Sequence, residues 1–160
     1  MQLMEVSNNG IELIKKFEGC KLTAYKCPAG VWTIGVGHIK GVTQGMVITQ
    51  ALAEQYLKDD IKPIQALLNG MGINYKQNQF DALVSWIFNL GAGNFNSSTL
   101  KKHIVANRSD EEIGDQIIRW VNAGGKPLLG LKRRRVAEAN MFVGKELYYI
   151  DSNNNIKKRK

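Results

Sequence analysis

Cysteine and histidine are both scarce in this chain of 160 residues, which contains two of each. Two cysteines, Cys20 and Cys27, are not enough for a disulfide framework. The two histidines, His38 and His103, lie far apart in the sequence, so no cluster with the ligand spacing of a zinc site is present. We therefore expect a protein with no bound metal and no cofactor, whose thiols are reduced.

Apolar runs long enough to cross a membrane are missing as well, since no segment approaches ~20 consecutive apolar residues. Residues 1–10 have neither the basic start nor the apolar stretch of a secretory signal, so we expect synthesis and folding in the cytoplasm. Three prolines, and 16 glycines without a regular period, exclude collagen-like and low-complexity classes. The length predicts one globular domain, residues 1–160, that folds without covalent or metal cross-links.

Negative charge is in the minority, with 14 acidic against 22 basic residues, a formal net charge of +8 and a pI near 9.5. Such a chain is attracted to polyanions, among them nucleic acid, a bacterial envelope and acidic lipid. The basic residues lack interleaved aromatic residues and no nucleic-acid-binding motif is found, so we expect no nucleic acid partner. We interpret the basic runs at 132–135 and 157–160 as solvated charge whose sign suits an anionic envelope surface.

Hydrophobic periodicity predicts a mainly helical α+β chain. Ser7 or Asn8 can cap a first helix that ends at Glu18. Strand-forming residues at 23–39, with Pro28 second in a turn at 27–30, predict an antiparallel hairpin or three-stranded sheet. Further helices are expected over 49–69 with Pro63 as a kink or break, 76–90 capped by Asn74, 98–106, 109–122 with a capping box of Ser109 and Glu112, and 132–143. The polar tail at 151–160 is expected to fray.

Glu18 is the candidate for acid catalysis. A carboxyl at the C-terminal end of a helix faces the negative end of the helix dipole, which disfavours its ionised form. A carboxyl that keeps its proton near neutral pH suits a general acid. A solvated glutamate at a helix end is the more common occurrence, so the residues around Glu18 must decide between the two interpretations.

Those residues form a longer pattern. Glu18, Cys27 and Thr33 are spaced as Glu, eight residues, Cys, five residues, Thr, and the run Thr-Ile-Gly-Val-Gly-His occupies 33–38. Further matching stretches lie at 79–85, 88–91 and between 120 and 135. With this combination the chain resembles the phage-type lysozyme (endolysin, muramidase) family over roughly residues 10–142.

The resemblance implies an α+β, mainly helical, lysozyme-like fold with a substrate cleft between two lobes. Residues 1–48 would form a small lobe with the first helix and the sheet, 49–69 a bridging helix, 70–150 a helical lobe and 151–160 a basic tail. The implied reaction is hydrolysis of the β-1,4 bond between N-acetylmuramic acid and N-acetylglucosamine in peptidoglycan, for host cell lysis. The resemblance also implies a monomer that reaches peptidoglycan after release through the inner membrane, opened by a phage holin.

By the same resemblance Glu18 protonates the leaving oxygen, while Cys27 and Thr33 handle the attacking water on the opposite side of the sugar. Cys27 stands where an Asp is more common in the family, and a thiol is mostly neutral at pH 7. It can act as a base when ionised, hydrogen-bond a water, or only fill space. His38 and Asn89 are expected to bind substrate, although a structural, hydrogen-bonded role fits each of them as well.

Three alternatives stay open from the residues alone. A non-catalytic peptidoglycan-binding module could keep the fold, but Glu18 and Thr33 are both present. A membrane-active protein could use the basic C-terminal helix and tail. Cys20 and Cys27 are seven positions apart, so a hairpin could bring them within disulfide range or leave them pointing apart.

Overall fold

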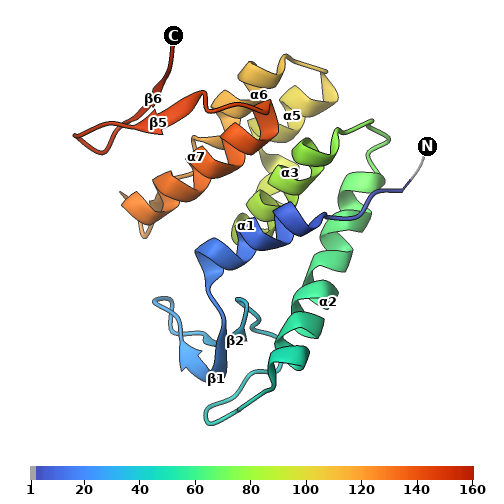
Figure 1. The fold of residues 1–160 in the computed structure, drawn as a ribbon, viewed down its shortest axis with the longest axis vertical. Coiled ribbons are helices and arrows are strands. Elements are labelled where there is room, and N and C mark those ends of the chain that lie inside the picture. Colours follow the sequence, from blue (N-terminus) through green and yellow to red (C-terminus); the bar gives the residue numbers. More distant parts are fainter. Residues whose placement is uncertain (1–2) are drawn as a thin grey trace.

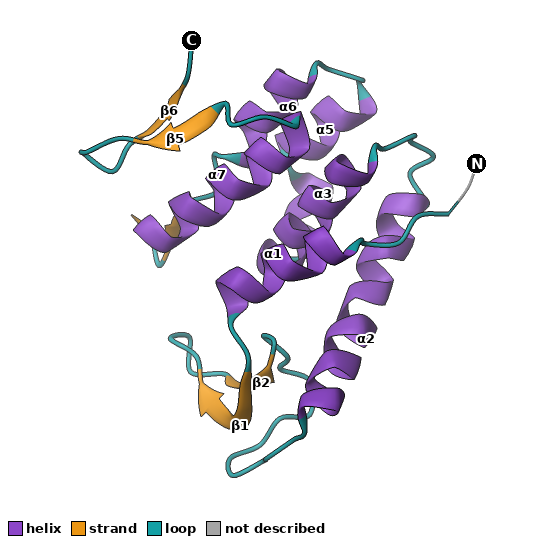
Figure 2. Ribbon diagram, viewed as in Figure 1, coloured by secondary structure: helices purple, strands orange, loops and turns teal. Residues whose placement is uncertain are grey.

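The computed structural model describes residues 3–160, and helices dominate it (Figure 2). The elements run in chain order as α1 (Asn8–Glu18), β1 (Lys21–Lys26), β2 (Trp32–Gly35), α2 (Gln50–Asn69), α3 (Gln77–Leu90), α4 (Ala92–Ser97), α5 (Thr99–Val105), α6 (Asp110–Ile117), β3 (Asn122–Ala123), β4 (Lys126–Pro127), α7 (Leu129–Val143), β5 (Tyr148–Ile150) and β6 (Ile156–Lys158). Within the described residues the strands form three two-stranded antiparallel sheets. The α+β, mainly helical fold class predicted from the sequence is confirmed.

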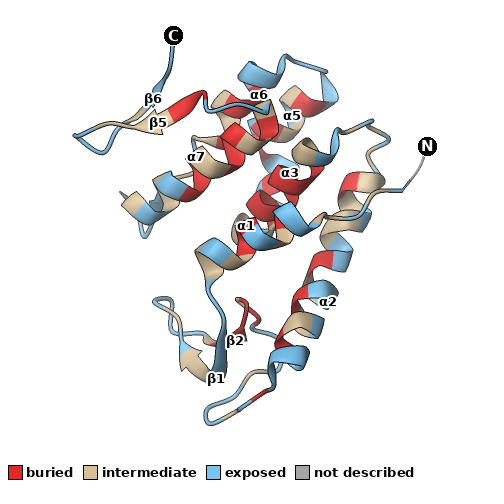
Figure 3. Ribbon diagram, viewed as in Figure 1, coloured by how far each residue is buried: buried red, intermediate tan, exposed pale blue. Residues whose placement is uncertain are grey.

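The centre of the molecule is α3, whose residues from Phe80 to Ile87 are all buried (Figure 3). It contacts α1, α2, α4 and α7, and together these helices enclose the larger hydrophobic core. Ile14 of α1 is fully buried in this core. The first helix, which we expected to pack with the small lobe, therefore belongs by packing to the helical part, because its apolar face lies against α3.

A second, smaller core lies under the β1–β2 sheet and consists of Ile34, Ile48 and Ala53. The turn between the strands has the predicted form: Gly30 N–H donates to Cys27 O at 2.8 Å, with Pro28 in the second position. A single bridge between Thr23 and Val47 adds a third segment beside β1. The structure thus combines the two predicted alternatives, a hairpin with one further bridge.

The helix α2 connects the two cores, with Ala53 in the smaller and Leu57, Ile61 and Leu68 in the larger one. Figure 1 shows α2 running from the small sheet to the opposite end of the molecule, close to the N-terminal segment. Thr49 caps it, accepting a hydrogen bond from Leu52 N at 3.1 Å. The helix continues through Pro63, so of the expected kink or break the structure excludes the break.

Several expectations for the second half need correction. Asn74 does not cap α3, which begins at Gln77 with Gln79 accepting from Lys76 N at 3.0 Å. The predicted capping box of Ser109 and Glu112 starts α6, but the helix ends at Ile117 instead of continuing to 122. Positive φ angles at Gly124 and Gly125 then form the turn of the short β3–β4 hairpin, and α4 had not been expected.

The C-terminal tail is ordered as part of a hairpin rather than frayed. Strand β6 pairs with β5 from Tyr148↔Lys158 to Ile150↔Ile156. Asp151 closes the turn by accepting from the backbone N–H groups of Asn153 and Asn155, both at 2.9 Å. The polar composition of residues 151–160 predicted fraying, because composition alone does not show that this segment pairs with β5.

Candidate active site

Glu18 is the last residue of α1, and Gly19 follows it with a φ of 72°. The Glu18 side chain is 21% exposed, and its Oε2 accepts a hydrogen bond from Arg134 Nη1 on α7. Its Oε1 lies against Gly37, where an added Cβ would stand 2.8 Å from that oxygen. Gly37, with a φ of 65°, thus allows the chain after β2 to pass beside the carboxylate.

Two opposing electrostatic influences act on Glu18. The C-terminal end of α1 disfavours a negative charge there, as expected from the sequence. The Arg134 guanidinium, whose side chain is 4% exposed, favours that charge. The basic run at 132–135 is therefore not simply solvated, since Arg134 and Arg135 are both buried while Arg133 is exposed.

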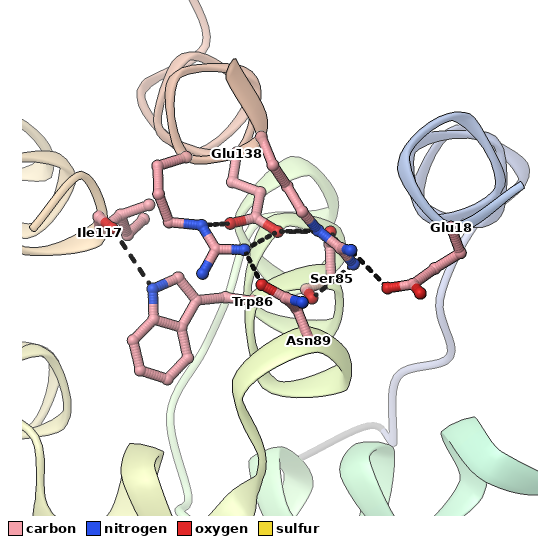
Figure 4. A network of polar contacts seen from close by, with 8 residues as sticks. Glu18, Ser85, Trp86, Asn89, Ile117 and Glu138 are labelled. Carbon is pink, nitrogen blue, oxygen red and sulfur yellow. Dashed lines mark hydrogen bonds and ion pairs between the residues drawn. The ribbon is translucent and has the colours of Figure 1, made fainter. Parts of the chain in front are cut away.

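Behind Glu18 a network of buried polar side chains joins α7 to α3 (Figure 4). Glu138 accepts from Ser85 Oγ at 2.5 Å and from Arg134 Nε at 3.2 Å. Arg135 donates from Nη2 to Asn89 Oδ1 at 2.6 Å, and its Nε lies 2.9 Å from Glu138 Oε1 in an ion pair without hydrogen-bond geometry. Burial raises the pKa of the Glu138 carboxyl, and the two guanidinium groups oppose that rise.

This network was missed from the sequence, although the helical spacing contains a signal for it. Asp81, Ser85 and Asn89 recur every four residues and form a polar stripe on a helix that is otherwise apolar. Arg134 and Glu138 have the same spacing on α7. Buried polar side chains need hydrogen-bond partners, so a polar stripe on each of two buried helices indicates that the two stripes face each other.

Cys27 lies at the end of β1 and begins the turn to β2. Hydrogen bonding from the Val31 backbone N–H, and to a smaller degree from Ala29 and the Thr33 hydroxyl, lowers the pKa of the Cys27 thiol. Thr33 is 4% exposed, and its hydroxyl donates to Val31 O at 3.0 Å. The sequence pattern placed both residues in the site; the structure puts Thr33 beneath the turn and leaves Cys27 partly exposed.

Tyr25, on β1, was not expected in the site. It pairs with Thr33 across the sheet, and Lys21 Nζ lies 4.3 Å from the centre of its ring. Burial raises the pKa of Tyr25, and the nearby charges of Glu18 and Cys27 raise it further. Tyr25 thus lies close to both the carboxyl and the thiol that the sequence pattern selected.

The other two predicted site residues are held by contacts within the protein. His38 is 7% exposed, stacks on Tyr56 at a centroid distance of 4.2 Å and has its Nδ1 2.8 Å from Asp60 Oδ2. Asn89 is only partly buried, but its Oδ1 is engaged by Arg135. These contacts favour a structural role for His38, while Asn89 keeps an amide N–H group that can donate a hydrogen bond to a sugar oxygen.

Cys20 and Cys27 are both free thiols. They lie at opposite ends of β1, and seven residues of extended chain span about 20 Å, whereas a disulfide needs Cα atoms within about 7 Å. The structure therefore excludes the disulfide that the sequence left open.

A cavity of about 720 Å³ lies between α1, α7 and the segment before β5, with Phe17 and Arg133 in its wall. Glu18, Cys27 and Thr33 do not line it. Residues 3–160 contain no group of three His, Cys, Asp or Glu side chains placed to hold a metal ion. Within the same residues no helix is both long and apolar enough to cross a membrane.

Comparison with known proteins agrees with this fold. A sequence model named phage lysozyme matches residues 15–138. The endolysin of Acyrthosiphon pisum secondary endosymbiont phage 1 is 41% identical, over 87% of this chain and 98% of that protein. The endolysin of Bacillus phage PZA is 40% identical over 87% of this chain, which spans only 55% of that relative. The structure of an endolysin from Escherichia coli O157:H7 phage FAHEc1 superimposes with a TM-score of 0.79 at 37% identity, covering 89% of this chain and 95% of that one.

The fold and these matches define a glycosidase with a lysozyme-like architecture. The chain belongs to the phage lysozyme family. It is a muramidase, a peptidoglycan hydrolase of the endolysin type that acts in host cell lysis.

Proposed function

We propose that Glu18 is the general acid of this muramidase and gives its proton to the glycosidic oxygen that leaves. One oxygen of the carboxyl is held by Arg134, and the other faces the chain at Gly37. A carboxyl held at one oxygen presents the other in a fixed direction, which is what proton transfer to a bound sugar requires.

Cys27 acts on the attacking water in this proposal, and Thr33 positions Cys27. The hydrogen bonds that lower the pKa of the thiol increase the thiolate fraction near neutral pH. A thiolate accepts the proton of the water as it attacks the anomeric carbon, while the proton of Glu18 goes to the leaving oxygen. Thr33 is buried beneath the turn and its hydroxyl donates to Val31 O, so it supports the turn that begins at Cys27 and does not contact the water directly.

The observation that carries the proposal is the contact between Glu18 and Gly37. Gly37 follows β2 by two residues, and a Cβ added there would stand 2.8 Å from Glu18 Oε1, so the end of α1 and the β1–β2 hairpin, whose turn begins at Cys27, meet at the Glu18 carboxyl. An acid and a base on two sides of one space are the arrangement that glycoside hydrolysis uses.

The test is the variant Glu18→Gln, assayed by clearing of chloroform-treated Gram-negative cells and by release of reducing ends from purified peptidoglycan. The amide occupies the same volume but has no acidic proton, so we expect a loss of activity of roughly 100-fold or more with the fold retained. Circular dichroism and the unfolding midpoint serve as controls for the fold. Clearing at nearly the wild-type rate would rule out Glu18 as the acid.

The release route is part of the same proposal. An enzyme of host lysis that is made inside the host must reach the wall across the inner membrane, and a phage holin would open that path. We expect cells that express the chain alone to stay intact and to lyse when chloroform is added. Spontaneous lysis during expression, absent in cells that express Glu18→Gln, would contradict this route.

We further propose that the enzyme acts as a monomer and is drawn to the anionic envelope by its charge of +8. Exposed basic residues of the C-terminal hairpin, such as Lys157, Arg159 and Lys160, contribute to that attraction. Binding to isolated cell walls should weaken as salt rises from 50 to ~300 mM, because salt screens charges at a surface. Binding that does not depend on salt would contradict the electrostatic part.

A further inference from the structure

Four ionisable side chains form a row in space that leads from the site into the core, in the order Glu18, Arg134, Glu138 and Arg135. Their side-chain exposures fall from 21% to 4%, 0% and 0%. Two carboxylates and two guanidiniums give a formal sum of zero. Because uncompensated charge is costly away from water, the balance of the whole row matters to each member, including Glu18.

Glu138 fixes how Arg134 is turned. The carboxylate accepts from Nε of Arg134, while Nη2 donates to Ser85 O at 3.2 Å and Nη1 donates to Glu18. All three nitrogens of the guanidinium are thus directed, and the plane of the group has a single orientation. The Ser85 hydroxyl, 2.5 Å from Glu138 Oε2, holds the carboxylate in turn.

Glu138 also opposes the effect of the arginines on Glu18. A general acid must carry a proton before it reacts, and two guanidinium groups in the row favour the ionised form of Glu18. The negative charge that Glu138 carries when it is ionised lies beside both guanidiniums and reduces the positive potential that Glu18 experiences. Arg135 Nη1 has no hydrogen-bond partner among residues 3–160, so hydrogen bonding alone does not account for the burial of the Arg135 guanidinium.

We propose that Glu138 is a positioning residue for the hydrolysis: acting through Arg134, it orients the Glu18 carboxyl, and its buried carboxyl balances the guanidinium charge beside Glu18. This inference rests on the proposed role of Glu18 as general acid. The charged or titratable groups near Glu18 are Arg134 and Arg135 from α7, Tyr25 from β1 and Cys27 from the turn after β1, with Lys15 and Lys16 on its own helix. Phe88 from α3, which with Glu18 flanks Gly37, carries no charge.

The direction of the pH effect follows from the charges. Activity that depends on a protonated Glu18 falls as the pH rises and that proton is lost. In Glu138→Gln the opposing negative charge is gone, so the alkaline limb of kcat/KM moves to lower pH, by about one pH unit. Loss of the Arg134 orientation lowers kcat roughly tenfold at the pH optimum, with KM little changed.

The matched control is Glu12→Gln, which removes the same charge from α1, the helix that carries Glu18. Glu12 is 74% exposed, so water screens its charge and the pH profile should stay where it is. The double variant Arg135→Gln with Glu138→Gln removes one charge of each sign. It should return the alkaline limb toward the wild-type position while kcat stays low, because Arg134 Nε has still lost its carboxylate.

Glu138→Gln leaves two buried guanidiniums without a counter-charge and can fail to fold; the balanced double variant then carries the test through its kcat and its pH profile. A folded Glu138→Gln, or the double variant in its place, with wild-type kcat and pH profile would overturn the proposal. If Glu18→Gln is inactive while the Glu138 variants behave as wild type, only the role of Glu138 fails. If Glu18→Gln is active, the role of Glu18 itself fails.

Discussion

Lys15 Nζ on α1 lies 2.6 Å from Glu54 Oε1 on α2, so an ion pair links the helix that carries Glu18 to the helix that connects the two cores. Hydrogen bonding to Lys15 lowers the pKa of Glu54, and the same contact raises the pKa of Lys15. The lowered carboxyl pKa means that stability is lost as the pH falls through it. The raised ammonium pKa means that stability is lost as the pH rises through it.

We therefore predict that Glu54→Gln lowers the free energy of unfolding by about 0.5 kcal/mol between about pH 5 and pH 10, and by nothing measurable near pH 2. The figure is small because both side chains are about one-third exposed. Urea unfolding across this pH range is the measurement. Asp59→Asn, which breaks the more exposed Asp59–Lys62 pair on α2, is the control and should have a smaller effect. A loss at pH 2 equal to that at pH 7 would contradict the ionic origin.

The N-terminal end of α1 is held by Asp81 on α3, which is 2% exposed. The carboxylate accepts from Ser7 N and Gln77 Nε2, both at 2.9 Å, and from the Ser7 hydroxyl. Asp81→Ala leaves these donors without their acceptor, so we predict a loss of about 2–4 kcal/mol in the free energy of unfolding. Asp81→Asn keeps one acceptor oxygen and should lose roughly half as much. Equal losses in the two variants would show that packing, not hydrogen bonding, is responsible.

Gly10 and Gly130 make a matched pair of glycines in helices. A Cβ on Gly10 would stand 2.5 Å from Val6 Cγ2 and 3.0 Å from Asp81 Cβ, whereas one on Gly130 would meet nothing within 4 Å. Gly10→Ala should therefore destabilise the protein by about 1–3 kcal/mol. Gly130→Ala should leave it unchanged or stabilise it by up to about 1 kcal/mol, because alanine restricts the unfolded chain. Thermal unfolding of both variants distinguishes a steric effect from a general effect of alanine.

Substitution of Cys27 tests whether the site needs a proton acceptor at that position. Cys27→Asp supplies a carboxylate and should retain measurable muramidase activity, while Cys27→Ala should lose most of it. Cys20→Ala, at the other end of β1, is the control and should behave as wild type. Activity of Cys27→Ala equal to that of wild type would reduce Cys27 to a packing role.

The separation of the two cysteines predicts the result of oxidation. After exposure to oxidised glutathione, quenching with acid and removal of the excess reagent by gel filtration, no species with an intramolecular bridge should be found, because β1 separates the two cysteines by about 20 Å. Mass spectrometry without reduction is the measurement. A mass lower by two hydrogens in the folded monomer would mean that the sheet opens in solution.

Much of the local structure could be predicted because it is encoded by neighbouring residues. The first helix from 8 to 18, the turn at Cys27 and the capping box of Ser109 and Glu112 all depend on residues within a few positions of one another. The motif of Glu18, Cys27 and Thr33 is equally local, since it spans one helix end and one hairpin. The errors fall where a distant partner decides the outcome, as in the C-terminal hairpin and the packing of α1.

The sequence by itself therefore determined most of the helices, the β1–β2 hairpin, the positions of the three motif residues and the family pattern. The tertiary structure decided which charges are buried. Arg134 and Glu18 are 116 positions apart, and the row from Glu18 to Arg135 exists only because α1 and α7 both pack on α3. A basic run looks the same in a sequence whether water solvates its charges or carboxylates pair with them, because burial and pairing are properties of the packed helices.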